Sequence, residues 1–283
     1  MTEAELYIKY KGVYLSKSMN PPQSLKYFED FTLGPDDIII ATYPKSGTHW
    51  MQHIVGLVLN GGDPTSVDTV HNWKRAPWLE QTSMIAFNLE ERPSPRVFST
   101  HFHHNMMPLS FFDVNPKVIY VMRNPKDVFT SYFHFHEAPF LVKPGSSSEF
   151  LHKFLNGKVS YGSWFDHVKS WLNAENKQHI MYISYEELSA DLKASVAKVA
   201  EFLEKRLDDE VMEKIAEKCL FENMKENKIF HSEVVSKYLD HTKFFRKGVV
   251  GDWKNLLAAE EAEHFDAVYT DKMKDVEYSI VWD

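Results

Sequence analysis

The eight residues from Tyr43 to Trp50, Tyr-Pro-Lys-Ser-Gly-Thr-His-Trp, constrain the fold more than any other stretch of this chain. They follow the apolar run 38–42 and precede a helix-like run that extends to about Leu59. A strand, a tight turn and a helix in this order hold phosphate in α/β proteins, because backbone N–H groups and the helix dipole face the anion. The alternative interpretation is an ordinary corner between a strand and a helix, with Lys45 as a surface residue.

The position of Lys45 separates this turn from the nucleotide-hydrolysing P-loop, which reads G-x-x-x-x-G-K-[ST]. Here Lys45 precedes Gly47 by two residues, and Thr42 stands where the first glycine of that motif would be. The sequence therefore predicts a P-loop-like anion site that is not of the ATPase type.

The net charge, the cysteine content and the distribution of apolar residues exclude several classes of protein. The net charge is −8, whereas a general nucleic-acid-binding protein is usually basic, so we expect no nucleic-acid partner. The single cysteine, Cys219, excludes an intramolecular disulfide and fits a reducing compartment. The first residues lack the apolar core of a secretory signal, and no apolar run has the length of a membrane span. We expect a cytoplasmic protein with no membrane partner.

Apolar strand-like runs at 96–100, 117–122 and 179–183 alternate with helix-like segments, the clearest at 128–137, 149–176, 190–204 and 208–218. Residues 1–35 read as a leader, 63–95 as loops and short helices, and 222–250 as irregular, with a helix resuming near Leu256 and running to Lys274. The alternation predicts an α/β fold with a central, mainly parallel sheet flanked by helices, in one domain spanning residues 1–283. Lys45, His101 and Arg123 each end a strand, so we expect them at the same edge of that sheet.

Two further segments supply candidate anion-binding groups. Arg123 follows a strand, and Ser131 lies eight residues later on the following helix. Residues 244–254, Phe-Phe-Arg-Lys-Gly-Val-Val-Gly-Asp-Trp-Lys, place two adjacent cations, Arg246 and Lys247, beside glycines that let the chain close over a phosphate. Each segment is a weak signal when taken alone.

Together, the three segments closely resemble the cytosolic sulfotransferases. The matching motifs are Tyr-Pro-Lys-Ser-Gly-Thr-x-Trp at 43–50, Arg-Asn-x-Lys-Asp at 123–127 with Ser-Tyr-x-His-Phe at 131–135, and Arg-Lys-Gly-x-x-Gly-Asp-Trp-Lys at 246–254. Their order and spacing agree across residues 43–254. The resemblance implies transfer of a sulfuryl group from 3′-phosphoadenosine 5′-phosphosulfate (PAPS), with PAP as the product and no metal, to a hydroxyl or amine of a small acceptor.

The resemblance also implies a role for each matching residue. The strand-loop-helix would hold the 5′-phosphosulfate, with Lys45 on the leaving oxygen and Trp50 stacked on adenine. His101 would be the general base, since a neutral imidazole can accept a proton near pH 7; His103 and His104 rank below it. The expected donor-binding set is Lys45, Ser46, Gly47, Thr48, His49, Trp50, Arg123, Ser131, Tyr185, Phe221, Met224, Phe245, Arg246, Lys247 and Gly248.

The acceptor pocket is the least constrained part of the site. An apolar wall suited to a phenol or a steroid-like alcohol would comprise Trp78, Phe102, Phe135 and Phe140, although core packing explains each of them equally well.

Three positions depart from the family pattern. Ser99 stands where many relatives have lysine, Cys219-Leu220 replaces a common hydroxyl pair, and Ala258-Ala259 interrupts the short dimer motif. The last of these predicts a monomer or a weak homodimer.

Two rival interpretations remain. A small-molecule kinase would need Mg²⁺ and the Walker order of glycine and lysine. A nucleotide-binding module without activity would keep the anion sites and lack the base. The histidines form no H-E-x-x-H pattern, and a single cysteine excludes a thiolate-rich zinc site, so we expect no metal.

Overall fold

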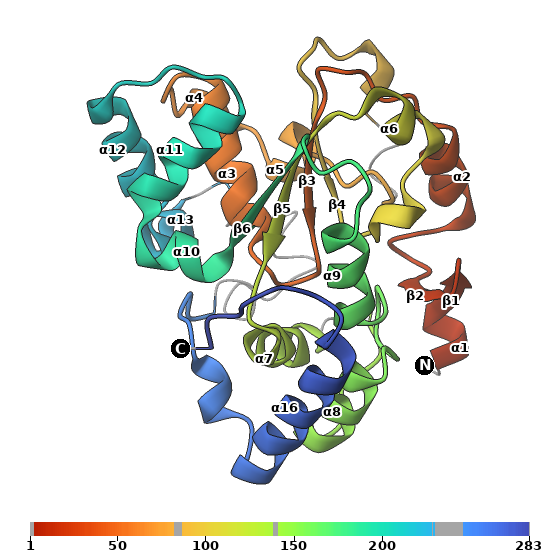
Figure 1. Ribbon diagram of the computed structural model, residues 1–283. Coiled ribbons are helices and arrows are strands. Elements are labelled where there is room, and N and C mark those ends of the chain that lie inside the picture. Colours follow the sequence, from red (N-terminus) through yellow and green to blue (C-terminus); the bar gives the residue numbers. More distant parts are fainter. Residues whose placement is uncertain (1–2, 82–86, 138–140, 228, 230–245, 283) are drawn as a thin grey trace.

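The computed structural model describes residues 3–81, 87–137, 141–227, 229 and 246–282 (Figure 1). Its central sheet has four parallel strands in the order β4–β3–β5–β6. The strands are β3 (Ile38–Thr42), β5 (Lys117–Met122), β4 (Val97–Thr100) and β6 (Ile180–Ser184). Helices cover both faces of this sheet in Figure 1, so the expected α/β fold with a parallel sheet flanked by helices is confirmed.

The sequence of β3 explains why both faces of the sheet are covered. Every residue of this central strand is buried, as a near-continuous apolar run in a parallel sheet should be. Ile39 and Ala41 point into one apolar core, and Ile38 and Ile40 point into a second core on the opposite face. The side-chain period of two therefore assigns the residues of one strand to two separate layers.

The helices divide between these two layers. The core that contains Ile38 and Ile40 is closed by α3 (Thr48–Leu59), α10 (Tyr185–Ala190), α11 (Leu192–Phe202) and α12 (Asp209–Lys218). The core that contains Ile39 and Ala41 is closed by α2 (Pro22–Asp30), α6 (Leu109–Val114), α7 (Pro125–Phe135), α8 (Ser147–Leu155), α9 (Trp164–Leu172) and α16 (Ala259–Met273). The shorter helices are α1 (Glu3–Leu6), α4 (Thr65–Thr69), α5 (Asn72–Arg75), α13 (Phe221–Glu226), η2 (Leu89–Glu91), η3 (His104–Met106) and η5 (Asp252–Asn255).

Several expected element boundaries differ from the structure. The single helix expected over 149–176 is two helices, α8 and α9, because Gly157, Tyr161 and Gly162 lie at φ values of 66°, 63° and 72°, which a helix cannot contain. The leader 1–35 contains an antiparallel hairpin, β1 (Tyr7–Tyr10) and β2 (Val13–Ser16), as well as α2. The segment expected to be irregular begins with α13, and the last helix starts at Ala259 rather than near Leu256.

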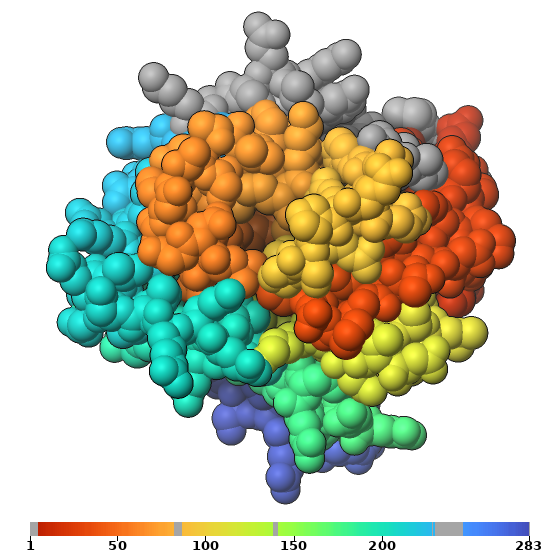
Figure 2. Space-filling model, turned by 90° about the horizontal axis from the view of Figure 1, so that it is seen from above, coloured from red at the N-terminus to blue at the C-terminus, as the bar shows by residue number. Residues whose placement is uncertain are grey.

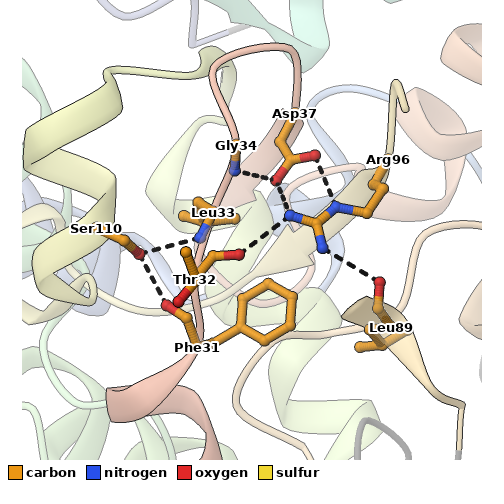
Figure 3. Close-up of polar contacts among 8 residues, drawn as sticks. All are labelled: Phe31, Thr32, Leu33, Gly34, Asp37, Leu89, Arg96 and Ser110. Atoms are coloured by element: carbon orange, nitrogen blue, oxygen red, sulfur yellow. Dashed lines mark hydrogen bonds and ion pairs between the residues drawn. The ribbon is translucent and has the colours of Figure 1, made fainter. Parts of the chain in front are cut away.

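A buried ion pair joins the starts of β3 and β4 (Figure 3). Arg96 donates from Nε to Asp37 Oδ1 at 2.9 Å and from Nη2 to Asp37 Oδ2 at 2.6 Å. The same guanidinium donates to the carbonyls of Thr32 and Leu89, and Asp37 accepts from the Gly34 N–H. This bidentate pair ties the segment before β3 to β4 and fixes the register in which Ile38 pairs with Val97.

The segment just before Glu80 extends the sheet beyond β4. Ser99 N–H donates to the Pro77 carbonyl at 2.8 Å, and Leu79 N–H donates to the Ser99 carbonyl at 2.9 Å, so Trp78 pairs with Ser99 in parallel. This pairing carries the indole of Trp78 to the end of β4, where His101 begins the next loop.

Candidate active site

The turn between β3 and α3 has the backbone conformation of an anion cradle. Lys45 has φ 68°, in the left-handed region that non-glycine residues rarely occupy, and Gly47, the N-cap of α3, has φ 106°. The first N–H groups of a helix have no partner within the helix and carry the positive end of its dipole. Ser46 is fully buried, and within the described part of the chain its hydroxyl has no hydrogen-bond partner. The cradle therefore presents unsatisfied donors to an anion.

His101 lies at the end of β4, directly beside the cradle. Its Nδ1 lies 2.9 Å from the carbonyl oxygen of Thr42, the last residue of β3. Because a carbonyl only accepts, Nδ1 carries the proton and Nε2 carries the lone pair. Thr42 Oγ1 also contacts Thr48 Oγ1 at 2.7 Å, which links His101 to the first turn of α3. The side chain is 9% exposed, and burial lowers the pKa of His101 to about 4, with Lys45 adding to the shift. The imidazole is neutral at pH 7.

The lone pair of His101 is occupied by Trp78. Trp78 Nε1 donates to His101 Nε2 at 2.9 Å, and both side chains are buried. An indole N–H can only donate, so this bond agrees with the tautomer set by the Thr42 carbonyl. Trp78 therefore contacts the candidate base directly, and its expected place in an acceptor pocket stays a prediction.

Lys45 extends from the cradle toward Phe135, with its Nζ 4.4 Å from the ring centroid. Burial, together with like-charge repulsion from Arg123 and Arg246, lowers the pKa of Lys45 to about 7. Three cations thus converge on one region of a protein whose net charge is −8. An anion bound among them would relieve the repulsion and restore the charge on Lys45.

Arg123 joins the cradle to the 246–251 turn. It donates from Nη1 to the Lys45 carbonyl at 3.1 Å and from Nη2 to the Val249 carbonyl at 3.2 Å. Its guanidinium lies 4.0 Å from the centroid of the Tyr185 ring. The buried Nε atoms of Arg123 and of Arg246 have no partner among the described residues, so both side chains retain a donor for a ligand.

Two aspartates organise the 246–253 turn; both stand in the matching motifs, but the sequence analysis assigned neither a role. Asp127, in the first turn of α7, accepts from the N–H groups of Gly251 at 2.7 Å and Trp253 at 3.0 Å. Asp252 is buried and forms ion pairs with both Arg246 and Lys247. A carboxylate therefore neutralises the two cations that the motif assigns to a phosphate.

The expected adenine-site residues also come together. The Trp50 ring packs edge-on against Tyr185 with centroids 5.0 Å apart, and Met224 contacts Trp50 and Phe221. Gly248 lies so close to Phe221 that a Cβ atom there would meet the ring at 2.2 Å. Ser131 lies on α7, half-buried. Phe245 and Phe140 fall outside the described residues, so their expected roles remain predictions.

Phe102 differs from the expectation. It is fully buried and packs edge-on against Phe28 and nearly parallel to Tyr10, inside the core beneath α2. It therefore contributes to packing and does not face an open pocket.

Hydrogen bonds to Glu80 and Trp171 hold the loop that carries His101 in place. Glu80 accepts from the His101 N–H at 2.9 Å and from Thr100 Oγ1 at 3.0 Å, and burial raises the pKa of Glu80 to about 7. On the other side, Trp171 Nε1 donates to the Phe102 carbonyl at 3.0 Å. His103 packs on His167, and His104 lies against Phe111 and Trp171. The competing histidines are thus packed into α9 and α6, while His101 faces the cradle.

Two departures from the family pattern have defined surroundings. Ser99 is buried, donates to the Ala76 carbonyl at 3.1 Å and accepts from Gln52 Nε2 at 2.7 Å. Cys219 is buried and its carbonyl accepts from Trp50 Nε1 at 2.8 Å, so the backbone rather than the side chain contacts the tryptophan. The neighbouring Leu220 is 49% exposed.

The space-filling view shows a hollow between the orange segment that carries α3 to α5 and the yellow segment that follows it (Figure 2). Within the described ranges, no three His, Cys, Asp or Glu side chains gather as metal ligands would. Among the same residues, no helix has the length and apolar character needed to cross a bilayer.

Comparison with known proteins gives one consistent match. A family model for the sulfotransferase domain matches residues 35–277. The chain is 42% identical over 282 residues to Sulfotransferase 2B1 of Mus musculus, covering 98% of this chain and 83% of that protein. It is 36% identical over 283 residues to an amine sulfotransferase of Oryctolagus cuniculus, covering 98% and 93%. The crystal structure of a mouse sulfotransferase complexed with PAP matches with a TM-score of 0.81 at 32% identity, covering 96% of each chain.

Proposed function

The chain belongs to the sulfotransferase family, and we propose that it transfers a sulfuryl group from PAPS to a hydroxyl or an amine of a small, mainly apolar acceptor. The observation that carries this proposal is the placement of His101. A neutral imidazole with its lone pair on Nε2 stands beside a cradle of unsatisfied donors, between β3 and β4. The mouse relative that was solved with PAP supports the choice of donor.

The donor would bind along the three anion sites. The cradle of Lys45, Ser46, Gly47 and Thr48 would hold the 5′-phosphosulfate through N–H groups, a hydroxyl and a cation. Arg123, Arg246 and Lys247, with Ser131 and Gly248, would hold the 3′-phosphate. Trp50, Tyr185, Phe221 and Met224 would enclose the adenine. The Nε atoms of Arg123 and Arg246 have no partner among the described residues, which supports the 3′-phosphate assignment, because a phosphate can satisfy both.

The transfer would need one proton acceptor and one stabilised leaving group. The acceptor O–H gives its proton to His101 Nε2 while its oxygen forms the new bond to sulfur. The bond between sulfur and the bridging phosphate oxygen breaks, and that oxygen keeps the electron pair as part of PAP. Lys45 neutralises the charge that develops there, which is the kind of electrostatic stabilisation that matters most in such transfers.

An acceptor must displace Trp78 from His101 before this step. The indole N–H holds the same lone pair that has to receive the acceptor proton. An aromatic or fused-ring acceptor could occupy the place that the indole leaves. This geometry supports a phenol or a steroid-like alcohol, and the rabbit relative supports an amine as the alternative.

We propose in addition a cytoplasmic location and a monomer or weak homodimer, with no metal in the reaction. The single buried thiol of Cys219 supports a reducing compartment. The Ala258-Ala259 substitution in the dimer motif supports weak association. Sedimentation that shows a tight dimer, or transfer that stops when EDTA is added, would contradict these points.

The first test is sulfate transfer from PAPS to a panel of phenols, steroids and aryl amines. His101→Ala should abolish transfer and leave PAP binding unchanged within about twofold, because the base does not contact PAP. His104→Ala is the matched control, since its ring packs against Phe111 and Trp171 and should leave transfer intact. Transfer that survives His101→Ala would show that another group is the base. PAP binding with no transfer to any acceptor would favour the nucleotide-binding module.

A further inference from the structure

The last described residues, 278–282, run back from α16 and reach the start of α7 (Figure 1). The carbonyl oxygen of Trp282 accepts from Asn124 Nδ2 at 2.9 Å and from Trp253 Nε1 at 3.2 Å. Asn124 directly follows Arg123, and Trp253 is the second residue of η5. The segment therefore links the two stretches of chain that carry the proposed 3′-phosphate ligands.

The ammonium group of Lys126 lies against both of these tryptophan rings. Its Nζ is 4.2 Å from the centroid of the Trp253 ring and 4.9 Å from the centroid of the Trp282 ring. It also forms an ion pair with Asp266 of α16 at 2.7 Å, and the Lys126 side chain is only 4% exposed. An ammonium group that is removed from water is attracted strongly to an indole ring. The Trp282 ring therefore fastens its segment to the first turn of α7.

Three contacts together fix the position of Trp253. Its backbone N–H donates to Asp127, the residue of α7 that follows Lys126. Its ring faces the Lys126 ammonium group, and its indole N–H donates to the Trp282 carbonyl. Two of these three contacts involve the segment 278–282, either directly or through the ammonium group that the Trp282 ring also faces.

Trp253 is coupled to the cations of the turn through its neighbour Asp252. Asp252 is buried and forms ion pairs with both Arg246 and Lys247. A shift of Trp253 moves Asp252, and with it the two cations that would bind the 3′-phosphate. Groups that the protein already holds in place lose less conformational entropy when a ligand binds, so a fixed turn binds the same phosphate more tightly.

We propose that Trp282 is a positioning residue for donor binding, which holds Lys126 and Trp253 and thereby the turn that would bind the 3′-phosphate. This inference rests on the proposed function. It adds to the site a segment that lies beyond residues 35–277, the part of the chain that the family model matches. Trp282 would act through Trp253 and not by touching the nucleotide.

The test measures PAP binding by calorimetry and steady-state transfer with PAPS as the varied substrate. Trp282→Ala removes the ring that faces Lys126, and we expect PAP affinity to fall about fivefold and KM for PAPS to rise by a similar factor. The kcat at saturating PAPS should not fall, because His101 and Lys45 are untouched. Trp282→Phe keeps a ring at this place and should stay within about twofold of the wild type in each quantity.

Val281→Ala is the matched control in the same segment, since Val281 is 51% exposed, and it should change none of these quantities. An unchanged PAP affinity in Trp282→Ala would overturn the inference. A lower kcat with an unchanged KM for PAPS would overturn it too, because that pattern shows a general loss of folded enzyme. Both results leave the proposed function intact if the wild type transfers sulfate.

The PAP measurements also separate the inference from the proposed function. If the wild-type chain binds PAP but transfers sulfate to no acceptor, the proposed function is wrong, and the PAP affinity of Trp282→Ala still decides the inference. If the wild-type chain binds no PAP, both are wrong.

Discussion

Trp78 and His101 share one hydrogen bond that occupies the lone pair of the candidate base. The bond joins two buried side chains that are 23 residues apart in the chain. Because the indole N–H occupies the lone pair of Nε2, the imidazole is shielded from any reagent that needs this lone pair. The position of one tryptophan therefore decides when His101 can accept a proton.

Trp78→Phe should expose the His101 lone pair while keeping an aromatic ring in place. We expect diethylpyrocarbonate to modify His101 several-fold faster than in the wild type, consistent with the loss of one hydrogen bond worth about 1 kcal/mol. Peptide mass spectrometry would identify the modified histidine. Trp73→Phe is the control, since Trp73 stacks on His71 in α5. Equal rates in the wild type and Trp78→Phe would show that the hydrogen bond does not limit access.

Lys45 gives the binding of PAP a dependence on pH. The pKa of Lys45 in the empty site is about 7, below its ordinary value, because the side chain is buried near two arginines. The cation is present below pH 7 and is lost as the pH rises through 7. PAP affinity, measured by calorimetry, should therefore decrease above pH 7, by up to about tenfold per pH unit.

Lys45→Arg should flatten this profile, because an arginine side chain stays protonated throughout the range. A wild-type affinity that stays constant from pH 6 to pH 9 would contradict the assignment of Lys45 as the titrating group. His101 does not contribute to this decrease in affinity, because its pKa of about 4 lies well below pH 7.

At the scale of elements, the starts of β3 and β4 depend on the ion pair of Asp37 and Arg96 (Figure 3). Removing one member leaves a buried charge without its partner. Arg96→Leu should lower the free energy of unfolding by about 3–5 kcal/mol, measured by urea denaturation. The exposed pair of Lys26 and Asp30 on α2 is the control, and Lys26→Ala should leave the urea midpoint nearly unchanged, because water screens an exposed ion pair. Equal small losses in both variants would show that the buried pair does not hold the strands.

Element-scale contacts also show where prediction from the sequence was limited. The four strands of the central sheet were recognised because each is a short apolar run that ends in a turn signal, whereas the hairpin of β1 and β2 was missed. The break between α8 and α9 was missed because Phe150, Trp164 and Trp171 keep an apolar pattern on both sides of it. The pairing of Trp78 with Ser99 was missed as well, since one bridge outside the named strands leaves no periodic pattern.

At the scale of the whole molecule, buried neutral histidines make stability sensitive to acid. Burial lowers the pKa of His53 to about 3, His101 to about 4 and His136 to about 3, and lowers the pKa of His167 well below its ordinary value. In the unfolded chain these groups titrate near the ordinary pKa of about 6.5. Between the folded and the unfolded pKa values, the unfolded state binds more protons than the folded state. The free energy of unfolding therefore rises with pH, and stability is lost as the pH falls below about 6.5.

Each such histidine contributes up to about 1.4 kcal/mol per pH unit within this window. Glu80 acts in the opposite direction, because burial raises its pKa to about 7 and the folded state holds that proton. Urea midpoints should therefore fall steeply from pH 6.5 to pH 5.5 and change little between pH 8 and pH 7.5. His53→Gln should weaken the pH dependence of the free energy of unfolding on the acid side, because the unfolded variant binds about one proton fewer. Midpoints that stay level down to pH 5.5 would refute this prediction.

Some properties of the whole molecule stay predictions. The single domain over residues 1–283 and the monomeric or weakly dimeric state were expected from the absence of linkers and from Ala258-Ala259. Limited proteolysis and sedimentation would test them.

The sequence by itself determined the α/β class, the family, the three anion-binding segments and His101 as the candidate base. Each of these depends on the local order of residues within one contiguous segment, which the chain displays directly. Only the tertiary structure decided that Trp78 covers His101, that Asp252 neutralises Arg246 and Lys247, and that Phe102 is a core residue. These contacts arise from the order of the strands and the packing of the helices on them, and such long-range geometry has no signature in the spacing of residues.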